Sequence, residues 1–276
     1  MPDLDIRSEF ESVNLGDERR DRRVRKLVAT IARRPAAGFP AVFDNEAALE
    51  AFYRLMNNDA VELSALQAPH RQESWRRASA RGGAVLVAHD TSEFTYGGEA
   101  ERSGLSRRGN TQSFHGHFAL ALAEGEAPVV HGVVAWSAHV IEDGVWCKAV
   151  DDGELFELLV GSERWSDLAA EVRLVAPPGQ QLIHVMDREA DDYPLWSRLV
   201  GQGDDFVIRA QHNRLLVGHE GKLFESLEQT PFVISRQVVL SRRGKRRPPG
   251  SRRTHPPRDR RPAKLSIRAS RVEVKR

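Results

Sequence analysis

Two apolar pentapeptides decide the fold that this chain is expected to adopt. The first is Ala84-Val-Leu-Val-Ala88, followed by His89-Asp90-Thr91, and the second is Leu182-Ile-His-Val-Met186, followed by Asp187. Short aliphatic runs of this kind, bounded by polar residues, are typical of strands buried inside a sheet. The sequence therefore predicts two buried strands, each of which ends in an aspartate.

The segments around these runs predict a mixed α/β sheet. Further strands are expected at residues 114–123, 129–137, 206–210, 232–240 and 264–274, and helices at residues 162–174 and 193–200. Loops are expected at residues 97–113, which begin with Gly97-Gly98, and at residues 242–262, which are rich in Arg and Pro. Three strands, a helix, a strand, a helix and a strand in this order favour a sheet with crossover connections.

The first 75 residues predict a small all-α unit. Residues 16–34 form one apolar stripe at helical spacing, made of Val24, Leu27, Val28 and Ile31. Asp44 is expected to cap a second helix, and Asn57-Asn58-Asp59 to begin a third. Three short helices suit a DNA-binding head, and they suit a helical dimerisation or packing module equally well.

Length and composition bound the class of protein. The chain has 276 residues, of which 40% are hydrophobic and 29% charged, so it can bury a core and has room for two domains. No run approaches the ~18–20 apolar residues that a membrane-spanning helix needs, and the N-terminus lacks the apolar stretch of a signal peptide. The single cysteine, Cys147, excludes an internal disulfide framework. We expect a soluble, cytoplasmic protein.

The formal net charge of +2 conceals an asymmetry along the chain. Residues 236–276 carry a net charge of +14, so the preceding residues carry −12. A second basic cluster lies near the N-terminus and consists of Arg19, Arg20, Arg22, Arg23, Arg25 and Lys26. Clustered positive charge is typical of a protein that binds nucleic acid, and it is equally typical of a solvated charged face with a basic tail.

Asp90 and Asp187 suggest chemistry because both follow buried strands. Sites in open α/β sheets form outside the carboxyl ends of the strands, so parallel neighbouring strands would bring the two carboxylates together. Carboxylates suit Mg²⁺ or Mn²⁺, and a pair of such ions stabilises both oxygens of an in-line phosphoryl transfer. The alternative is that Asp90 caps a turn through Thr91 and that Asp187 caps the next helix.

Two histidines on one predicted strand offer a second candidate. His115 and His117 are two positions apart within the strand expected at residues 114–123, so they share a face on which a metal could bind. No third ligand has suitable spacing, which favours a partly exposed strand or histidines that face DNA.

The run Asp187-Arg188-Glu189-Ala190-Asp191 resembles the DREAD signature of bacterial cut-and-paste DDE transposases of the insertion-sequence-four family. The similarity is collinear from residue 10 to residue 275. Leu15-Gly16-Asp17-Glu18-Arg19-Arg20 and residues 48–57 are similar to the family's DNA-end-binding domain. His89-Asp90-Thr91-Ser92 resembles the strand end that supplies the first catalytic carboxylate, and Phe206-Val-Ile-Arg209 with His212 resembles the strand after the second. Arg243-Gly244-Lys245-Arg246 and residues 263–268 are similar to the basic insertion subdomain.

The resemblance implies a fold and a domain order. The fold would be an RNase H-like mixed sheet with flanking helices, preceded by a small all-α DNA-binding domain and followed by an incomplete β-rich insertion subdomain. The corresponding ranges would be residues 1–75 for the end-binding domain, 76–215 for the first part of the catalytic core, and 216–276 for the insertion.

The resemblance also implies roles for individual residues. Asp90 and Asp187 would be two of three catalytic, metal-binding carboxylates that hold two Mg²⁺ or Mn²⁺ ions. Residues that would contact DNA are Arg19, Arg20, Arg23, Arg188, Arg209 and His212. The reaction would be metal-dependent cleavage at the inverted-repeat ends of a transposon, followed by strand transfer into target DNA. The partners would be double-stranded DNA and a second copy of the chain in a synaptic complex, in the cytoplasm at the nucleoid.

One departure from the family pattern limits these expectations. The family's third carboxylate belongs to a Y-xx-R-xxx-E-xxxxxx-K helix that follows the insertion subdomain, and no acidic residue here, Glu273 included, sits in such a motif. The sequence therefore predicts a C-terminally truncated transposase that binds DNA and is inactive alone. Two other hypotheses are a non-catalytic DNA-binding fragment that inhibits transposition and an RNase H-like nuclease unrelated to mobility.

Overall fold

A computed structural model describes most of the chain. The described residues are 6–80, 82–98, 102, 104–123, 129–148, 157–159, 163–218, 220–244 and 256–275. The chain divides into two compact units, Met1–Ala210 and Gln211–Arg276. The expected helical head and the expected sheet both lie in the first unit.

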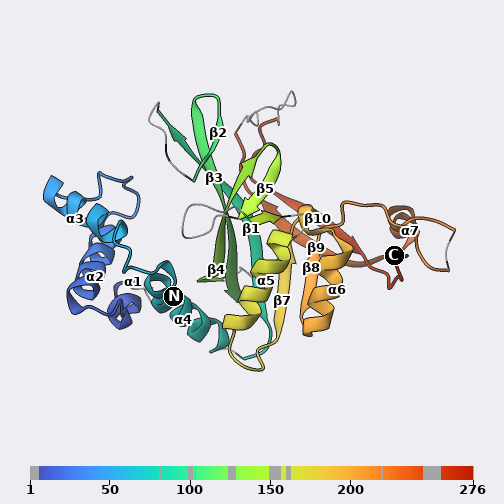
Figure 1. Cartoon of the computed structure of the whole chain (residues 1–276). Coiled ribbons are helices and arrows are strands. Elements are labelled where there is room, and N and C mark those ends of the chain that lie inside the picture. Colours follow the sequence, from blue (N-terminus) through green and yellow to red (C-terminus); the bar gives the residue numbers. More distant parts are fainter. Residues whose placement is uncertain are drawn as a thin grey trace. The chain divides into compact units, whose positions relative to one another are not determined.

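The first unit begins with a set of helices, as the sequence predicts (Figure 1). They are α1 (Ile6–Glu9), the 3₁₀ helix η1 (Phe10–Ser12), α2 (Glu18–Arg33), α3 (Glu46–Met56) and α4 (Leu63–Ser79). The side chain of Asp17 caps α2 by accepting a hydrogen bond from the Arg19 amide. The cap of α3 is Asn45, one residue after the expected Asp44.

The helical part has its own small core. Val24 and Val28 of α2 pack against Leu55 of α3 and against Val13 and Leu15 in the segment before α2. The apolar stripe that the sequence predicts on α2 is therefore the face that this core buries. Arg19, Arg22 and Arg23 lie outside this stripe and are exposed.

Eight strands in the described residues form one mixed sheet in the order β6-β5-β4-β3-β1-β7-β8, with β2 paired beside β3. Their bounds are β1 (Val85–Gly97), β2 (Ser106–Arg108), β3 (Thr111–Ala123), β4 (Val129–Glu142), β5 (Val145–Lys148), β6 (Glu157–Leu159), β7 (Leu182–Met186) and β8 (Asp205–Ile208). Strand β1 is antiparallel to β3 and parallel to β7, and β7 is parallel to β8. The two pentapeptides are thus parallel neighbours, which is the arrangement that would bring the carboxylates of Asp90 and Asp187 together.

The prediction that the first strand ends at Asp90 is wrong. β1 continues to Gly97, because residues 91–97 pair with residues 111–117 of β3 in a long antiparallel ladder. The loop expected at residues 97–113 is correspondingly shorter and includes β2. Thr, Phe and Tyr in this stretch favour a pleated surface, a weak preference that the cross-strand pairing reinforces.

Several short elements were not expected from the sequence, among them β2, β5, β6 and the helix α7 (Leu223–Gln229). Segments of three to seven residues are too short to show a helical or strand period. The short strands form by pairing, such as Val140 of β4 opposite Cys147 of β5.

Helices α5 (Glu163–Val175) and α6 (Tyr193–Gln202) cover one face of the sheet and lie side by side in Figure 1. Trp75 and Ala78 of α4 belong to the same core as α5. Leu168 and Val172 of α5 pack on Val87 and Leu182 of the two central strands, and all four are at most 1% exposed. Side chains alternate along a strand, so Asp90 and the intermediate residues of β1 lie on the other face.

The second unit contains a two-stranded antiparallel sheet. Its strands are β9 (Phe232–Leu240), as expected, and β10 (Arg261–Arg268), which begins and ends earlier than the strand expected at residues 264–274. Leu216 is fully buried and pairs with Val274 in an isolated bridge. Most of the loop expected at residues 242–262 lies outside the described residues.

Five histidines in the described part of the sheet are buried. Four of them, His89, His117, His139 and His184, have a pKa that burial lowers strongly. Burial lowers the pKa of His117 to about 3 and the pKa values of His139 and His184 to about 4, and it holds the pKa of His89 well below 6.5. Each of these side chains is therefore neutral in the folded protein at pH 7.

The free energy of unfolding is expected to fall as the pH drops from 6.5 toward 4. Histidines of the unfolded chain take up protons in this window, whereas His139 and His184 stay neutral until about pH 4. Each such histidine contributes up to about 1.4 kcal/mol per pH unit. Urea titrations followed by tryptophan fluorescence should show a weaker dependence on pH in His139→Gln than in the parent chain. An equal dependence in His139→Gln would contradict the assignment.

Candidate functional site

Asp90, Asp187 and Arg209 lie in one row across three neighbouring parallel strands. Ala88 of β1 is opposite Val185 of β7, and Met186 of β7 is opposite Ile208 of β8. Continued by one or two residues, this register places Asp90 opposite Asp187 and Asp187 opposite Arg209. Adjacent strands lie about 4.8 Å apart, so the Cα atoms of Asp90 and Arg209 are expected about 10 Å apart.

All three side chains project from the face that α5 and α6 do not cover. On this face Asp90 follows Leu86 and Ala88, and Asp187 follows Ile183 and Val185, at every second residue. Asp90, Asp187 and Arg209 are exposed, unlike the histidines and valines of the other face. The row therefore offers two carboxylates and a guanidinium to solvent at one edge of the sheet.

Each aspartate also bonds to the backbone beside it. The Thr91 amide donates to Asp90 Oδ1 at 2.9 Å, and the Glu189 amide donates to Asp187 Oδ1 at 2.8 Å. Asp187 caps the 3₁₀ helix η2 (Arg188–Ala190), as the capping alternative expects, whereas Asp90 lies inside a strand. One oxygen of each carboxylate is held by the backbone, which orients the carboxylate without burying it.

A hydrogen bond on the buried face joins the two strands directly below the row. His89 Nε2 and His184 Nδ1 are 2.8 Å apart, and the carboxylate of Asp204, which also pairs with Arg173, lies 3.5 Å from His184 Nε2. This bond fixes the position of β1 against β7. The alternation of apolar and polar residues in the sequence could not reveal it, because the two histidines are 95 residues apart.

The residues next to Asp187 differ in their surroundings. Arg188 is exposed, whereas Glu189 Oε2 accepts a hydrogen bond at 2.6 Å from Arg164 of α5. Arg164 lies over the ring of Trp146, 4.2 Å from its centroid. Burial lowers the pKa of Arg164, and the ion pair with Glu189 opposes that effect. Arg164 was not expected in the site, since a lone arginine in a helix gives no signal.

The two carboxylates fit a hard cation only in part. They are exposed oxygen ligands at neighbouring positions, the kind of ligand that Mg²⁺ and Mn²⁺ prefer. Within the described ranges, however, no group of three or more His, Cys, Asp and Glu side chains is placed to hold a metal ion. His117 is fully buried and its Nδ1 is 2.7 Å from Thr91 Oγ1, so the prediction of a partly exposed or DNA-facing side chain is wrong for this histidine.

A separate basic groove lies between α2 and α3. Its volume is about 400 Å³, and Phe43, Ala51 and Phe52 form its apolar side. The basic residues that line it are Arg19, Arg22, Arg23 and Lys26. These four recur at helical spacing, so their common face could have been read from the sequence, although Arg22 and Lys26 were not among the expected contacts.

The two other arginines of this cluster serve the helical fold. The guanidinium of Arg20 donates to the Ala60 carbonyl at 2.6 Å, and that of Arg25 donates to the Glu11 carbonyl at 3.2 Å and to Glu18 at 3.1 Å. Arg20 thus ties α2 to the segment before α4, and it is not among the residues that line the groove.

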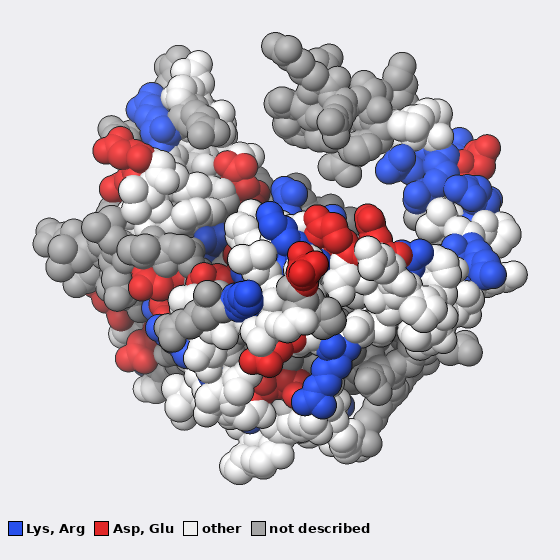
Figure 2. All heavy atoms as spheres, turned by 90° about the vertical axis from the view of Figure 1, so that its right-hand side faces the viewer, with Lys and Arg blue, Asp and Glu red and all other residues white. Residues whose placement is uncertain are grey.

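Charge on the face of the molecule that Figure 2 shows is mixed. Figure 2 shows one face of the molecule, on which lysine and arginine side chains form several separate groups with acidic side chains between them. His212, expected beside Arg209 in a DNA contact, is exposed and belongs to the second unit, whereas Arg209 belongs to the first.

The comparison with protein families found a match to the helical part of the chain. Residues 6–61 match the model of a family described as transposase DNA-binding. A search of curated proteins found no match to the chain. The family match supports the interpretation of the chain as a transposase with DNA as a partner, and the basic groove lies wholly within the matched residues.

The structure also bears on membrane association. Every helix in the described part of the chain is too short or too polar to cross a bilayer.

Arg20 and Arg19 are expected to differ in their effect on stability, although they are adjacent. Replacing Arg20 by Gln removes its bond to the Ala60 carbonyl and should destabilise the helical part by about 0.5–1.5 kcal/mol, the usual net contribution of one hydrogen bond. Arg19→Gln changes an exposed side chain of the groove and should leave stability within about 0.5 kcal/mol. Hydrogen exchange of the α2 amides measures both, and equal protection in the two variants would contradict this assignment.

Proposed function

We propose that the chain is a DDE-type transposase chain with an RNase H-like sheet, and that its helical head binds the ends of the mobile element. The observation that carries the proposal is the row of Asp90, Asp187 and Arg209 on β1, β7 and β8. Within the eight-stranded sheet, the antiparallel strands β4, β3 and β1 are followed by the parallel strands β7 and β8, and this part of the order supports the RNase H-like assignment. The family match of residues 6–61 supports the role of the head.

The basic groove is the proposed DNA contact. Four cations on one side of α2 can neutralise phosphates, and Phe43 and Phe52 offer apolar surface for sugars or base edges beside them. In this proposal Arg19 and Arg23 contact DNA directly, joined by Arg22 and Lys26, and Arg20 contributes by holding the groove in shape.

The proposed catalytic role rests on the two exposed carboxylates. Asp90 and Asp187 would hold Mg²⁺ or Mn²⁺, which supplies charge stabilisation to the attacking and leaving oxygens of a phosphoryl transfer. The backbone amides of Thr91 and Glu189 orient the two carboxylates, and Arg188 and Arg209 place positive charge where a DNA phosphate would approach. In this proposal a second copy of the chain completes the synaptic complex.

A second candidate function follows from the incomplete ligand set. Because the described residues offer no group of three metal ligands, the chain by itself would bind DNA without cutting it and would inhibit transposition by occupying the ends. The two candidates share the head and differ in whether DNA is cleaved.

Neutralising the groove is expected to reduce the salt dependence of DNA binding. Removal of one cation that neutralises a phosphate should lower the slope of log K against log salt by about 1, so Arg19→Gln and Arg23→Gln should each do so. Arg25→Gln is the matched control, because its guanidinium bonds to Glu11 and Glu18 and does not line the groove. Fluorescence anisotropy over a range of salt concentrations measures the slope, and an unchanged slope in both variants would remove the groove from the interface.

Removing either carboxylate is expected to weaken Mn²⁺ binding. The loss in Asp90→Ala and in Asp187→Ala should be at least as large as the ~10–100-fold that outer partners of a metal site contribute. Asp205→Ala is the control, since Asp205 is an exposed aspartate at the opposite end of the neighbouring strand β8. Electron paramagnetic resonance of free Mn²⁺ gives the affinity, and equal affinity in all three variants would refute the site.

The same variants distinguish the two candidate functions. Nicking of inverted-repeat DNA that needs Mg²⁺ and disappears in Asp187→Ala would support the transposase and exclude the purely inhibitory function. Binding to the repeats without nicking would favour the inhibitor, and nicking without preference for the repeats would favour a general nuclease.

A further inference from the structure

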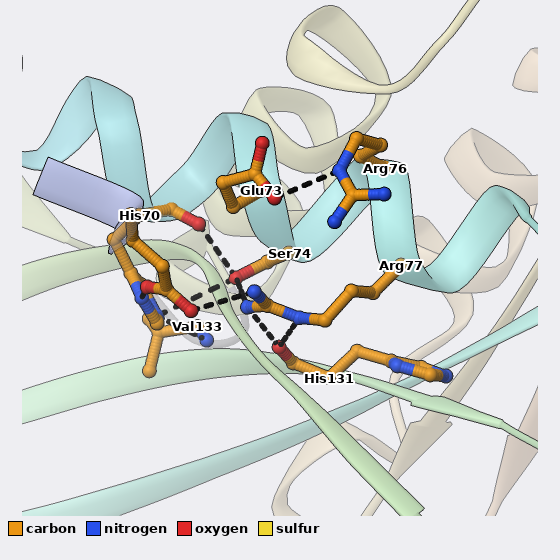
Figure 3. A network of polar contacts seen from close by, with 8 residues as sticks. His70, Glu73, Ser74, Arg76, Arg77, His131 and Val133 are labelled. Carbon is orange, nitrogen blue, oxygen red and sulfur yellow. Dashed lines mark hydrogen bonds and ion pairs between the residues drawn. The ribbon is translucent and has the colours of Figure 1, made fainter. Parts of the chain in front are cut away.

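A buried polar junction connects the matched DNA-binding residues with the sheet (Figure 3). Its centre is Glu9 at the end of α1, whose side chain is 3% exposed. His70 Nδ1 lies 2.6 Å from Glu9 Oε2, and Arg77 donates to Glu9 Oε1 at 2.6 Å. Glu9 belongs to the residues that match the DNA-binding family, whereas His70 and Arg77 belong to α4, beyond the match.

The junction continues from α4 to β4. The Val133 amide donates to His70 Nε2 at 3.1 Å, and Arg77 donates to the His131 carbonyl from both Nε, at 3.1 Å, and its terminal nitrogen, at 2.6 Å. Because His70 Nε2 accepts a hydrogen bond, the ring proton is on Nδ1 and points to Glu9. One carboxylate is thus joined through two side chains to two backbone groups of a central strand.

The backbone between these two groups is adapted to the contact. Gly132 has φ +146°, and a Cβ atom there would lie 2.0 Å from Ser74 Oγ and 2.9 Å from His70 Nε2. Any larger residue would push β4 away from α4. The close approach on which both hydrogen bonds depend therefore requires glycine at position 132.

Apolar packing beside the junction is loose. A cavity of about 530 Å³ separates helical residues, among them Leu27 and Leu66, from Phe114, Phe118 and Trp136 of the sheet. Since the two walls leave this volume between them, close packing does not fix the helical head on the sheet at this place. Directed contacts with Glu9 are then the specific restraint, because a buried carboxylate tolerates only positions that keep both of its partners.

We infer that Glu9, His70 and Arg77 are positioning residues, which set where DNA held by the head meets the edge of the sheet that carries Asp90 and Asp187. This inference rests on the proposed function. The three residues touch neither the basic groove nor the aspartates. They act by holding α1, α4 and β4 in one arrangement.

A distance measurement without DNA tests the junction itself. Spin labels at Arg33→Cys on α2 and Ser92→Cys on β1, both outside the buried core, are placed in a Cys147→Ala background. Double electron–electron resonance should give one narrow distance distribution, which Glu9→Gln should broaden or shift. Glu11→Gln, an exposed neighbour in η1, should leave it unchanged. A distribution as narrow in Glu9→Gln as in the parent chain would overturn the inference.

A second pair of variants guards against simple unfolding. Arg77→Met removes the link to the His131 carbonyl and leaves Glu9 with His70, so it should broaden the distribution even if Glu9→Gln does not fold. Arg76→Met, whose parent side chain is exposed and pairs with Glu73 on the same helix, should not. Equal distributions in the two arginine variants would also overturn the inference.

A cleavage map tests positioning on DNA. An iron chelate tethered at Ser92→Cys cuts a duplex copied from the inverted repeats that flank the coding sequence, and the cuts record where the sheet lies. Glu9→Gln should keep the affinity within about twofold, because the groove is a separate site, and should spread or shift the cuts. Unchanged cuts with DNA bound would overturn the positioning role alone. Failure of the parent chain to bind the duplex would overturn the proposed function, whatever the distance measurement shows.

Discussion

The parallel pairing of β1 with β7 is the constraint on which the rest of the structure depends. It joins segments almost a hundred residues apart, and the hydrogen bond between His89 and His184 fixes the two strands on their buried face. A shift of the pairing between β1 and β7 by one residue would turn Asp90 or Asp187 toward the helices. The row of acidic and basic side chains on the open face therefore depends on contacts made on the covered one.

The two faces of the sheet differ: one is buried under helices, and the other exposes charged side chains. α5 and α6 cover the face with Val87, Leu182 and the neutral histidines, whose protonation would destabilise the fold. The other face presents charged side chains at the carboxyl ends of β7 and β8, where open sheets commonly form their sites. The buried side chains thus lie on the face that the helices cover, and the charged side chains lie on the other face, where a polyanion can bind.

The helical head shows a similar division at a smaller scale. One stripe of α2 makes the apolar core with Leu55, and the other side carries the cations of the groove. Arg20 and Glu9 serve the fold instead: Arg20 bonds to the Ala60 carbonyl within the head, and Glu9 bonds to His70 and Arg77 of α4. Charged residues in this head are therefore of two kinds, some available to DNA and some committed to the fold.

The helical head, the mixed α/β pattern and the two buried pentapeptides could all be predicted from the order of the residues, because apolar periodicity and capping act over a few residues. The motif around Asp187 directed attention to the ends of β7 and its neighbours, and the match of residues 6–61 supports a transposase. Only the tertiary structure decided that β1 and β7 are parallel neighbours, that β1 runs on to Gly97, and that Arg20 bonds to the Ala60 carbonyl while Arg22 and Lys26 line the groove. These features depend on contacts between residues that are distant in the sequence, so a local pattern cannot predict them. The same holds for the junction at Glu9.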